Sequence, residues 1–202
     1  MSDESLTRTY RKRARAVQEE ETRRRITEAA MELHGSIGPA RTTISAVAER
    51  AGVQRATVYR HFPDEASLFG ACSVHWAALH PPPDASRWAS IADPTERLRT
   101  ALGELYAWYG SDEQMFVNIF RDAELVPAMR APVEARTQRF EQVVAEIVRG
   151  RPERGRARKR VAAAVAHAAS FATWHALTRQ GGLSDDEAVA VAAGMVAAAA
   201  AG

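Results

Sequence analysis

The sequence predicts an all-α protein of two helical domains, on three observations. Residues with high helix propensity, chiefly Ala, Arg, Glu and Leu, outnumber those that favour strands. Apolar residues recur three and four positions apart in one segment after another, which is the spacing of one helix face. The stretch Thr42–Phe62, TTISAVAERAGVQRATVYRHF, has the pattern of two short helices joined by a tight turn. The 202 residues suffice for one large domain or two small ones.

Charge is distributed unevenly along the chain. Residues 1–62 hold twelve Arg and Lys against eight Asp and Glu, a net charge of +4, whereas the remainder holds fifteen against seventeen, a net charge of −2. A basic N-terminal part and a mildly acidic C-terminal part are consistent with a nucleic-acid-binding domain joined to a domain of different function. Ordinary scatter of charge would also produce an excess of this size.

The cysteine content and the weak hydrophobicity of the apolar segments indicate the cellular compartment of the protein. Cys72 is the only cysteine, so no intrachain disulfide can form and a reducing compartment is expected. The N-terminus has no apolar core of the kind a signal peptide needs. The Ala-rich stretches 161–172 and 188–201 are too weakly apolar for membrane spans. We therefore expect a soluble, cytoplasmic protein with no membrane partner.

The first segment, residues 1–17, is predicted to be a basic flexible arm, because it has hardly any apolar residues. Such an arm can lie along phosphates or enter a minor groove, or it can be a solvated tail with no partner. Its basic residues are Arg8, Arg11, Lys12, Arg13 and Arg15.

Residues 18–79 are predicted to form a helix-turn-helix domain with a connecting fourth helix. The first helix begins near Thr22, or earlier, and ends at about Ser36; its buried stripe is Ile26, Ala29, Ala30 and Leu33. Thr43 is a suitable N-cap for the second helix, and Gly52 provides the left-handed conformation of the turn. A third helix covers Gln54 to His61, with Val58 pointing back at the second. A fourth begins at the N-cap Asp64 and ends at about Leu79.

The stretch Thr22–Phe69 resembles the DNA-binding domain of the tetracycline-repressor (TetR) family of bacterial regulators. The matching pieces are the stripe on the first helix, Gly38, Thr42-Thr43, Val47-Ala48, Ala51-Gly52-Val53, Thr57-Val58-Tyr59, His61-Phe62 and Leu68. The sequence departs from the family pattern at two places. His34 stands at a position that is usually aromatic or aliphatic, and Glu65 stands where a lysine would approach phosphate.

The resemblance implies which residues contact duplex DNA. The third helix would enter the major groove, as in other helix-turn-helix proteins. Contacts to the DNA backbone are expected from Arg41, Thr43, Tyr59 and His61, and Thr42 is a further residue expected to bind DNA. The candidates near base edges are Gln54, Arg55, Ala56, Thr57 and Arg60.

Residues 80–92 are predicted to be a linker, because three prolines follow His80. Residues 93–202 are predicted to form a second helical domain for effector binding and dimerisation. Capping boxes at Asp93–Glu96, Ser111–Gln114 and Ser184–Glu187 should open three of its helices. Further helices should cover Pro132–Gly150 and a stretch ending at about Thr178. The run of six basic residues between 151 and 160 is interpreted as a solvated loop and helix start.

The second domain collects aromatic residues that can line a cavity or make an ordinary core. The family resemblance implies an effector pocket, for which the candidates are Tyr106, Tyr109, Phe116, Phe120, His167, Phe171 and Trp174. The last two helices are rich in Ala and Val and allow close packing, either between two copies of the chain or within one. The candidates for the dimer interface are Val165, Ala169, Val189, Ala193 and Val196.

Motifs of catalysis are absent from the sequence. We find no Gly-rich phosphate loop, HExxH, GxSxG or paired-cysteine spacing, and Cys72 with His75 makes at most half a metal site. We therefore expect no catalytic residues, no metal and no cofactor. The expected function is that of a homodimeric DNA-binding transcription factor, most simply a repressor released from its operator by a small-molecule effector. Two alternatives stay open: a constitutive DNA-binding dimer with a filled core, and a helical protein–protein interaction module.

Overall fold

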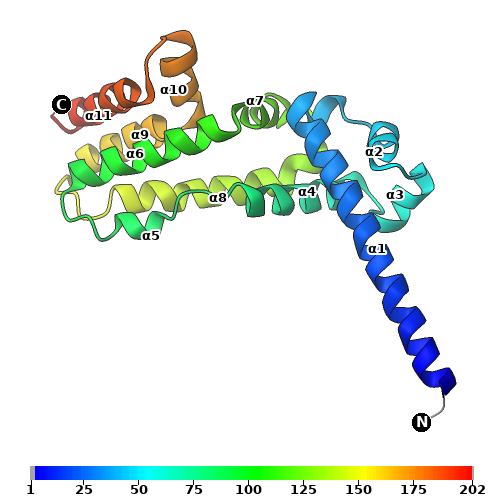
Figure 1. Cartoon of the computed structure of the whole chain (residues 1–202). Helices are drawn as coiled ribbons and strands as arrows, with labels where there is room; N and C mark the ends of the chain where they lie inside the picture. The colour runs from blue at the N-terminus through cyan, green and yellow to red at the C-terminus, as the bar shows by residue number, and fades with distance from the viewer. Residues whose placement is uncertain (1–2, 202) are drawn as a thin grey trace. The chain divides into compact units, whose positions relative to one another are not determined.

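The computed structural model describes the backbone of residues 3–201 and the side chains of residues 10–201 (Figure 1). All regular secondary structure within this range is helical, which confirms the all-α prediction. The helices are α1 (Asp3–Ser36), η1 (Pro39–Arg41), α2 (Ile44–Ala51), α3 (Arg55–His61), α4 (Glu65–Leu79), α5 (Ala85–Trp88), α6 (Pro94–Ser111), α7 (Glu113–Asp122), η2 (Pro127–Met129), α8 (Arg130–Ile147), α9 (Gly155–Ala168), α10 (Phe171–His175), η3 (Ala176–Gln180) and α11 (Asp185–Ala201).

The chain divides into two compact units. The first unit contains residues 1–79 and 117–132, and the second contains residues 80–116 and 133–202. The first boundary falls at Leu79, where we expected the connecting helix to end. Residues 117–132, which we assigned to the second domain, instead belong to the first unit. The chain therefore passes between the units three times: after α4, within α7 and near the start of α8.

The core of the first unit forms where α1 packs against α2 and α4, and α2 against α3. The predicted apolar stripe of α1 is buried there, and Ile26 and Ala30 have no exposed surface. Val47 of α2 and Val58 of α3 are equally inaccessible. These small and branched side chains allow the short helices to cross closely.

The turn between α2 and α3 has the predicted geometry. The Thr43 hydroxyl accepts a hydrogen bond from the Ala46 backbone N–H at 3.1 Å and so caps α2. Gly52 is in the left-handed conformation with φ of 65°, and the backbone N–H of Val53 donates to the Ala48 carbonyl. The chain therefore reverses within three residues and places α3 directly against α2.

Helix α1 is longer than predicted. We expected a flexible arm over residues 1–17, but helix begins at Asp3 and continues without a break to Ser36. Residues 1 and 2 lie outside the described range. Arg and Glu are the commonest residues of α1, and they are strong helix formers. Arg15 pairs with Glu19 at 3.0 Å, and Arg24 pairs with both Glu21 and Glu28, at the spacings that stabilise a helix.

The predicted linker is partly helical. Within residues 80–92 the short helix α5 carries Trp88, whose side chain is 1% exposed. The Trp88 indole N–H donates to the Glu104 carboxylate on α6 at 2.9 Å. Three prolines do end α4, but the large apolar ring after them fixes the following segment to the second unit.

In the second unit, α6 begins with the predicted Asp93 cap, whose carboxylate accepts from the Thr95 backbone N–H at 2.9 Å. The capping box at Ser184 and Glu187 also forms, because each side chain bonds the backbone N–H of the other residue. Ser111, which we expected to open a third box, is instead the last residue of α6. Its hydroxyl donates back to the Trp108 carbonyl.

The helix expected to run to about Thr178 is interrupted at Ser170. The Ser170 hydroxyl accepts from the Thr173 backbone N–H and starts the separate helix α10, which continues as one turn of π-helix. The last two long helices, α9 and α11, pack against each other, and α11 also packs against α6. Among residues 3–201, no helix combines the length and apolar character that crossing a bilayer requires.

Candidate nucleic-acid interface and aromatic core

Helix α3 presents a polar face to solvent. Val58 anchors the helix in the core, while Tyr59 on the outer side is 45% exposed. Thr57 is half-buried between the two faces. The exposed side chains of the segment are Gln54, Arg55, Ala56, Tyr59 and Arg60. This set contains amide, guanidinium and phenol groups, which are the groups that contact base edges and phosphates in a major groove.

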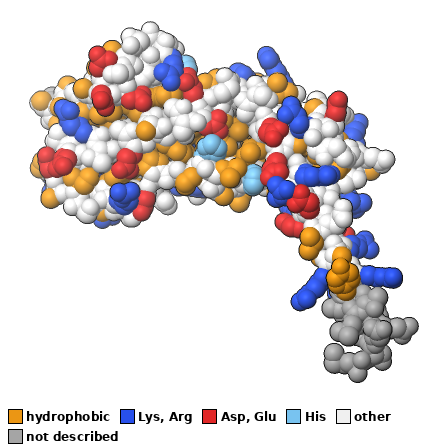
Figure 2. Space-filling model, viewed as in Figure 1, with side chains coloured by type: hydrophobic (Ala, Val, Ile, Leu, Met, Phe, Trp, Pro, Cys, Tyr) orange, Lys and Arg blue, Asp and Glu red, His pale blue; other side chains and the backbone are white. Residues whose placement is uncertain are grey.

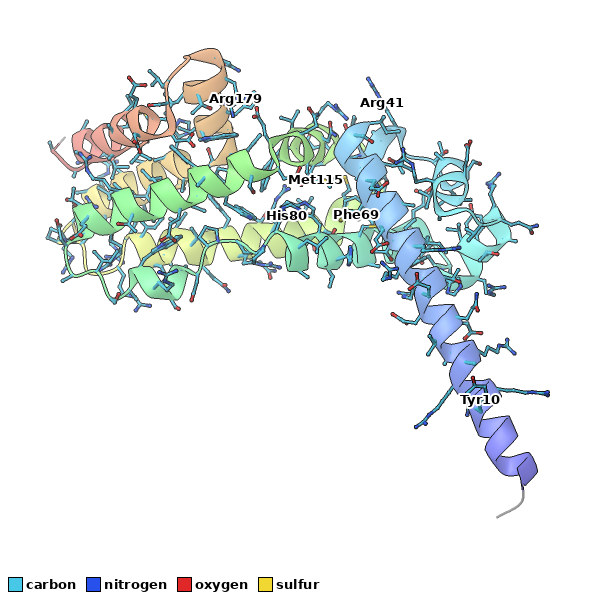
Figure 3. All side chains as sticks on the ribbon, viewed as in Figure 1. Tyr10, Arg41, Phe69, His80, Met115 and Arg179 are labelled. Carbon is cyan, nitrogen blue, oxygen red and sulfur yellow. The ribbon has the colours of Figure 1, made fainter. Side chains whose placement is uncertain are left out.

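The segment before α2 already uses some of its hydrogen-bonding groups. The Thr43 hydroxyl accepts from a backbone N–H, and its own proton is available to a phosphate. The Thr42 hydroxyl donates its only proton to the Gly38 carbonyl at 2.9 Å, so in this geometry it cannot donate to DNA. Arg41 lies at the end of η1 with its side chain exposed (Figure 3).

His61, at the end of α3, is less accessible than we expected. Its ring is half-buried, and Nε2 is enclosed with no hydrogen-bond partner among the described residues. Burial lowers the pKa of His61, and the nearby cations Arg60 and Arg23 lower it further. The ring is therefore neutral at pH 7. The His61 carbonyl accepts a hydrogen bond from the Arg23 guanidinium at 2.7 Å.

Arg23 is a residue that the sequence reasoning missed. Its guanidinium lies 4.1 Å from the centroid of the Phe62 ring, in addition to its bond to the end of α3. It therefore fixes α3 against α1. Its position on α1, three residues before Ile26 and so on the side of the helix that carries the apolar stripe, was the available signal.

A second group that the sequence did not reveal connects α7 with the segment between α1 and α2. The Asn118 amide donates to the carbonyl oxygens of His34 at 3.0 Å and Gly35 at 2.7 Å, which are unpaired groups at the end of α1. The Asp122 carboxylate, 1% exposed on its side chain, accepts from the Ala40 backbone N–H at 3.0 Å. Arg121 bridges the two, with bonds to the Asn118 oxygen and the Asp122 carboxylate.

We name Asn118, Arg121 and Asp122 the α7 clamp. Arg121 holds the pKa of Asp122 below its usual range, and the Ala40 N–H contributes in the same direction. Gly38 has φ of 93°, and a Cβ atom at that position would collide with the Arg121 and Asp122 side chains. The clamp thus determines the path of the chain into Arg41 and the α2 N-cap.

Of the seven residues predicted to contact an effector, four have rings in mutual contact in the second unit, and a fifth, Tyr106, is buried three residues before Tyr109 on α6. Tyr109 contacts Phe116 edge-on with ring centroids 5.2 Å apart, and Phe116 stacks on Phe171 at 5.4 Å. Trp174 lies 5.5 Å from Phe171. The hydroxyl groups of Tyr106 and Tyr109 donate to the carbonyls of Ala168 and Ala169, at 2.7 and 2.8 Å.

These rings are buried, and the Trp174 indole N–H donates to the Asp185 carboxylate at 2.8 Å. Burial raises the pKa of Tyr106 and Tyr109, so both are neutral phenols at any ordinary pH. We name Tyr106, Tyr109, Phe116, Phe171 and Trp174 the aromatic cluster. At its edge, the Arg179 guanidinium lies over the Trp174 ring and pairs with Glu113 at 2.8 Å (Figure 3).

The other two residues are exposed. Phe120 lies one turn after Phe116 on α7, but the boundary between the units falls between them, and Phe120 is 43% exposed in the first unit. His167 is exposed at the end of α9, where the two alanines that follow it are buried instead. A shared aromatic character was therefore not enough to predict shared burial.

The residues proposed for the dimer interface need a similar correction. Val165, Ala169 and Val196 are completely buried by their own chain, and Ala193 is 6% exposed, so these side chains offer little or no surface to a second copy. Val189 is half-buried. The small side chains serve the packing of α9 against α11 within one subunit. The opposite face of α11 exposes Val191, Gly194, Met195 and Ala198.

The described residues contain no cluster of three metal-ligating side chains. Cys72 is buried, its thiol donates to the Thr27 carbonyl at 3.5 Å, and burial raises its pKa to about 12. It is therefore a packing residue of α4 and not a reactive thiolate.

Comparisons with known proteins agree with the helix-turn-helix geometry. Residues 26–72 match the profile of bacterial regulatory proteins of the tetR family. A search of curated proteins found no match.

Solved structures have the same fold along nearly the whole chain. A TetR-like transcriptional regulator from Rhodococcus sp. RHA1 is 20% identical, with a TM-score of 0.62 over 90% of this chain and 96% of the other. AibR in complex with isovaleryl coenzyme A and operator DNA is 21% identical, with a TM-score of 0.61 over 86% and 97%. A transcriptional-regulator candidate from Saccharomonospora viridis in complex with choline is 21% identical, with a TM-score of 0.61 over 88% and 96%.

Proposed function

Because residues 26–72 make this chain a member of the tetR family of bacterial regulatory proteins, we propose that it is a homodimeric repressor whose operator complex is released by a small molecule. The observation that supports operator binding is the exposed polar face of α3, fixed to the core through Val58 and to α1 through Arg23. A rigid helix with an outward face of this kind can enter a major groove without rearrangement. Such a protein works in the cytoplasm, where the operator is.

The residues of the interface divide by their chemistry. Arg41, Thr43 and Tyr59 are exposed or retain a donor, and they would hold phosphates. Gln54, Arg55, Ala56 and Arg60 lie on the outer face of α3 and would approach base edges. Thr57 and His61 are half-buried, and Thr42 has no free proton, so their role is to support the others.

Selection of bound sequences from a random duplex pool tests the DNA-binding function. Arg55→Ala should change the preferred sequence, whereas Arg41→Ala should weaken all duplexes by a similar factor. The control Arg99→Ala removes the same charge from an exposed position of α6 in the second unit. Equal and negligible affinity of the wild type for every duplex, at low salt, would contradict the function and favour the protein–protein interaction module.

The effector would bind at the aromatic cluster. The cluster supplies several apolar ring faces and few charges, which suits a ligand of low to moderate polarity. Two solved relatives carry small molecules, isovaleryl coenzyme A in AibR and choline in the Saccharomonospora viridis protein. In this chain the rings contact one another and the tyrosine hydroxyls have partners, so a ligand has to displace some of these contacts.

Release would follow from the connections between the units. The chain crosses between them after α4, within α7 and near the start of α8, so α4 is not the only element that can transmit a movement. Helix α7 carries Phe116 of the aromatic cluster and, two residues later, Asn118 of the α7 clamp. A ligand that binds one arrangement of these helices better than another shifts the equilibrium by that difference in affinity.

Calorimetric titration with and without operator tests the release. A thermal-shift screen first identifies a ligand, and a Phe171→Ala variant then checks its site. Linkage requires that operator and ligand weaken each other by the same factor, roughly 5- to 150-fold for couplings of about 1–3 kcal/mol. Equal affinity in both titrations would indicate a constitutive DNA-binding dimer, which is the second candidate.

The dimer would form through the exposed face of α11. Val191 is 44% exposed and Met195 is 38% exposed, and Gly194 and Ala198 lie on the same side at helical spacing. A two-fold axis places this patch against its own copy, so that small and large residues can interlock. The buried residues of α9 and α11 support the patch from within.

A further inference from the structure

Helix α1 extends well beyond the part that packs in the first unit. The first residue of the core is Ile26, whereas the described side chains begin at Tyr10, which is 74% exposed (Figure 3). Val17, midway, is 70% exposed. At 1.5 Å per residue the stretch from Tyr10 to Ile26 is about 24 Å long.

The extension meets α3 at the C-terminal end of α3. Ala14, Arg15, Gln18 and Glu19 of α1 line one shallow groove together with Arg60 of α3. One turn further along, Arg23 bonds the carbonyl of His61 at the end of α3. The face of α1 that includes Arg15 and Glu19 is therefore the face shared with the exposed side of α3.

Basic side chains gather on this same face. At about 100° per residue, Arg11 lies about 40° from Arg15 around the helix, and Lys12 lies about 60° from it. Arg13 lies about 160° away, on the opposite face. All four side chains are exposed, and basic side chains project from this part of α1 in Figure 2. The three residues Arg11, Lys12 and Arg15 form what we name the α1 stripe.

The stripe is poorly neutralised by the chain itself. Arg15 pairs with Glu19, with side-chain exposures of 82% and 54%. Arg11 and Lys12 have no acidic residue three or four positions later, because those positions hold Ala14, Arg15 and Ala16. Cations at these spacings repel one another on a helix. An array of anions beside the stripe would remove this repulsion.

We propose that the α1 stripe binds backbone phosphates of the same duplex that α3 enters, on the flank of the half-site. The proposal rests on the proposed operator binding, and it replaces a disordered basic tail with a rigid helix that has one DNA-facing side. Arg11 lies about 6 Å along the helix from Arg15, the length of about two base pairs. Phosphate contacts carry no sequence preference, so the stripe adds affinity and salt dependence without adding specificity.

The test compares matched charge removals by gel shift over a range of salt concentrations. Arg11→Gln and Arg13→Gln remove the same charge two residues apart on opposite faces. The double variant Arg11→Gln/Lys12→Gln is compared with Arg13→Gln/Arg99→Gln, which removes two exposed charges away from the stripe. Circular dichroism confirms that each variant keeps its helix content. The duplex is the selected operator with ten base pairs added on either side.

A plot of log affinity against log salt concentration has a negative slope, and each lost phosphate contact should reduce the magnitude of that slope by about 0.9. We expect the stripe variants to show this decrease and the controls to keep the wild-type slope. Arg11→Lys should restore the slope, because it keeps the charge. A duplex trimmed to the α3 half-sites should remove the difference between Arg11→Gln and wild type.

The outcomes separate the two proposals. If wild type binds the operator and Arg11→Gln has the same slope as Arg13→Gln, the stripe proposal is overturned and the operator-binding function stands. If the wild type binds no duplex, both fall. A preference of the double variant for different sequences would also overturn the proposal, because it would make the stripe a base reader.

Discussion

His34 occupies a core position of α1, at a place where the family resemblance implies an apolar side chain. It is 7% exposed, and its ring centroid lies 5.0 Å from that of Phe69. Burial lowers the pKa of His34 from 6.5 to about 4, although the Asp122 carboxylate acts in the opposite direction. The ring is therefore neutral at pH 7 and serves as an aromatic packing group.

His34→Phe should remove a pH dependence of stability. Between about pH 6.5 and pH 4 the unfolded chain binds a proton at His34 and the folded chain does not, so stability is lost as the pH falls through this range. At 1.36 kcal/mol per pH unit the loss is about 3 kcal/mol. Urea unfolding at pH 4.5, 5.5 and 7 measures it. The variant should lose less stability than wild type across this range, by up to that amount.

The control for this comparison is His167→Gln, which removes a histidine from an exposed position. It should retain the wild-type dependence on pH. If the free energy of unfolding of His34→Phe depended on pH as that of wild type does, the buried ring would be protonated without loss of stability. That result would contradict the role assigned to its burial.

At the scale of the element, α7 contributes buried residues to both units, which its composition does not reveal. Its apolar residues Met115 and Phe116 are buried in the second unit, and Asn118 and Asp122 are buried in the first. Burial of a carboxylate is tolerated here because the backbone N–H of Ala40 and the Arg121 guanidinium both donate to it.

Asp122→Ala should destabilise the first unit by about 1–3 kcal/mol, because it leaves a buried backbone N–H without its acceptor. It should also weaken operator binding, since the clamp sets the path of the chain into Arg41 and Thr43. Equilibrium unfolding and gel shift measure the two effects. Glu124→Ala, an exposed change two residues later, is the control. Equal stability of the two variants would show that the clamp is not needed.

The elements differ in how much the sequence reveals of them. The helix-turn-helix was predictable almost residue by residue, because Thr43, Gly52 and Val58 act through local geometry. The continuation of α1 through residues 3–17 was not, since the same Arg and Glu residues are typical of a solvated tail and of a helix. The break at Ser170 was missed because a hydroxyl within an apolar helix either caps a new helix or bonds the preceding turn.

Prediction of the candidate sites from the sequence is limited in the same way. The outer face of α3 followed from the position of Val58, whereas the aromatic cluster required knowledge of which helix faces meet. Phe120 has the same spacing from Phe116 as a second core residue would have, yet it belongs to the other unit. Spacing predicts the face of a helix, but it does not predict what that face contacts.

At the scale of the whole molecule, dimerisation determines whether the two α3 helices can bind one operator. Half-sites one helical turn apart require reading helices about 34–36 Å apart. Since Val165 and Ala193 are buried within the subunit, charging them would unfold it and would say nothing about assembly. The exposed face of α11 provides the informative substitution.

Met195→Glu should produce a folded monomer with weakened operator affinity, because a two-fold axis brings the new carboxylates close together. Light scattering at micromolar concentration reports the mass, and circular dichroism reports the fold. Leu125→Glu places the same charge on an exposed apolar residue of the first unit, 68% exposed, and should stay dimeric. A Met195→Glu protein that stays dimeric would exclude this face of α11 as the interface.

The division of α7 between the units affects any attempt to isolate the DNA-binding part. A fragment that ends at Leu79 contains the entire helix-turn-helix and lacks residues 117–132. In that fragment the carbonyls of His34 and Gly35 and the N–H of Ala40 have water as their partner instead of Asn118 and Asp122. A synthetic peptide of residues 117–132, added in trans, should then raise the melting temperature of the fragment, and the same peptide with Asp122→Ala should raise it less. The operator-binding part is in this sense assembled from two separate stretches of the gene, and a cut between them divides it.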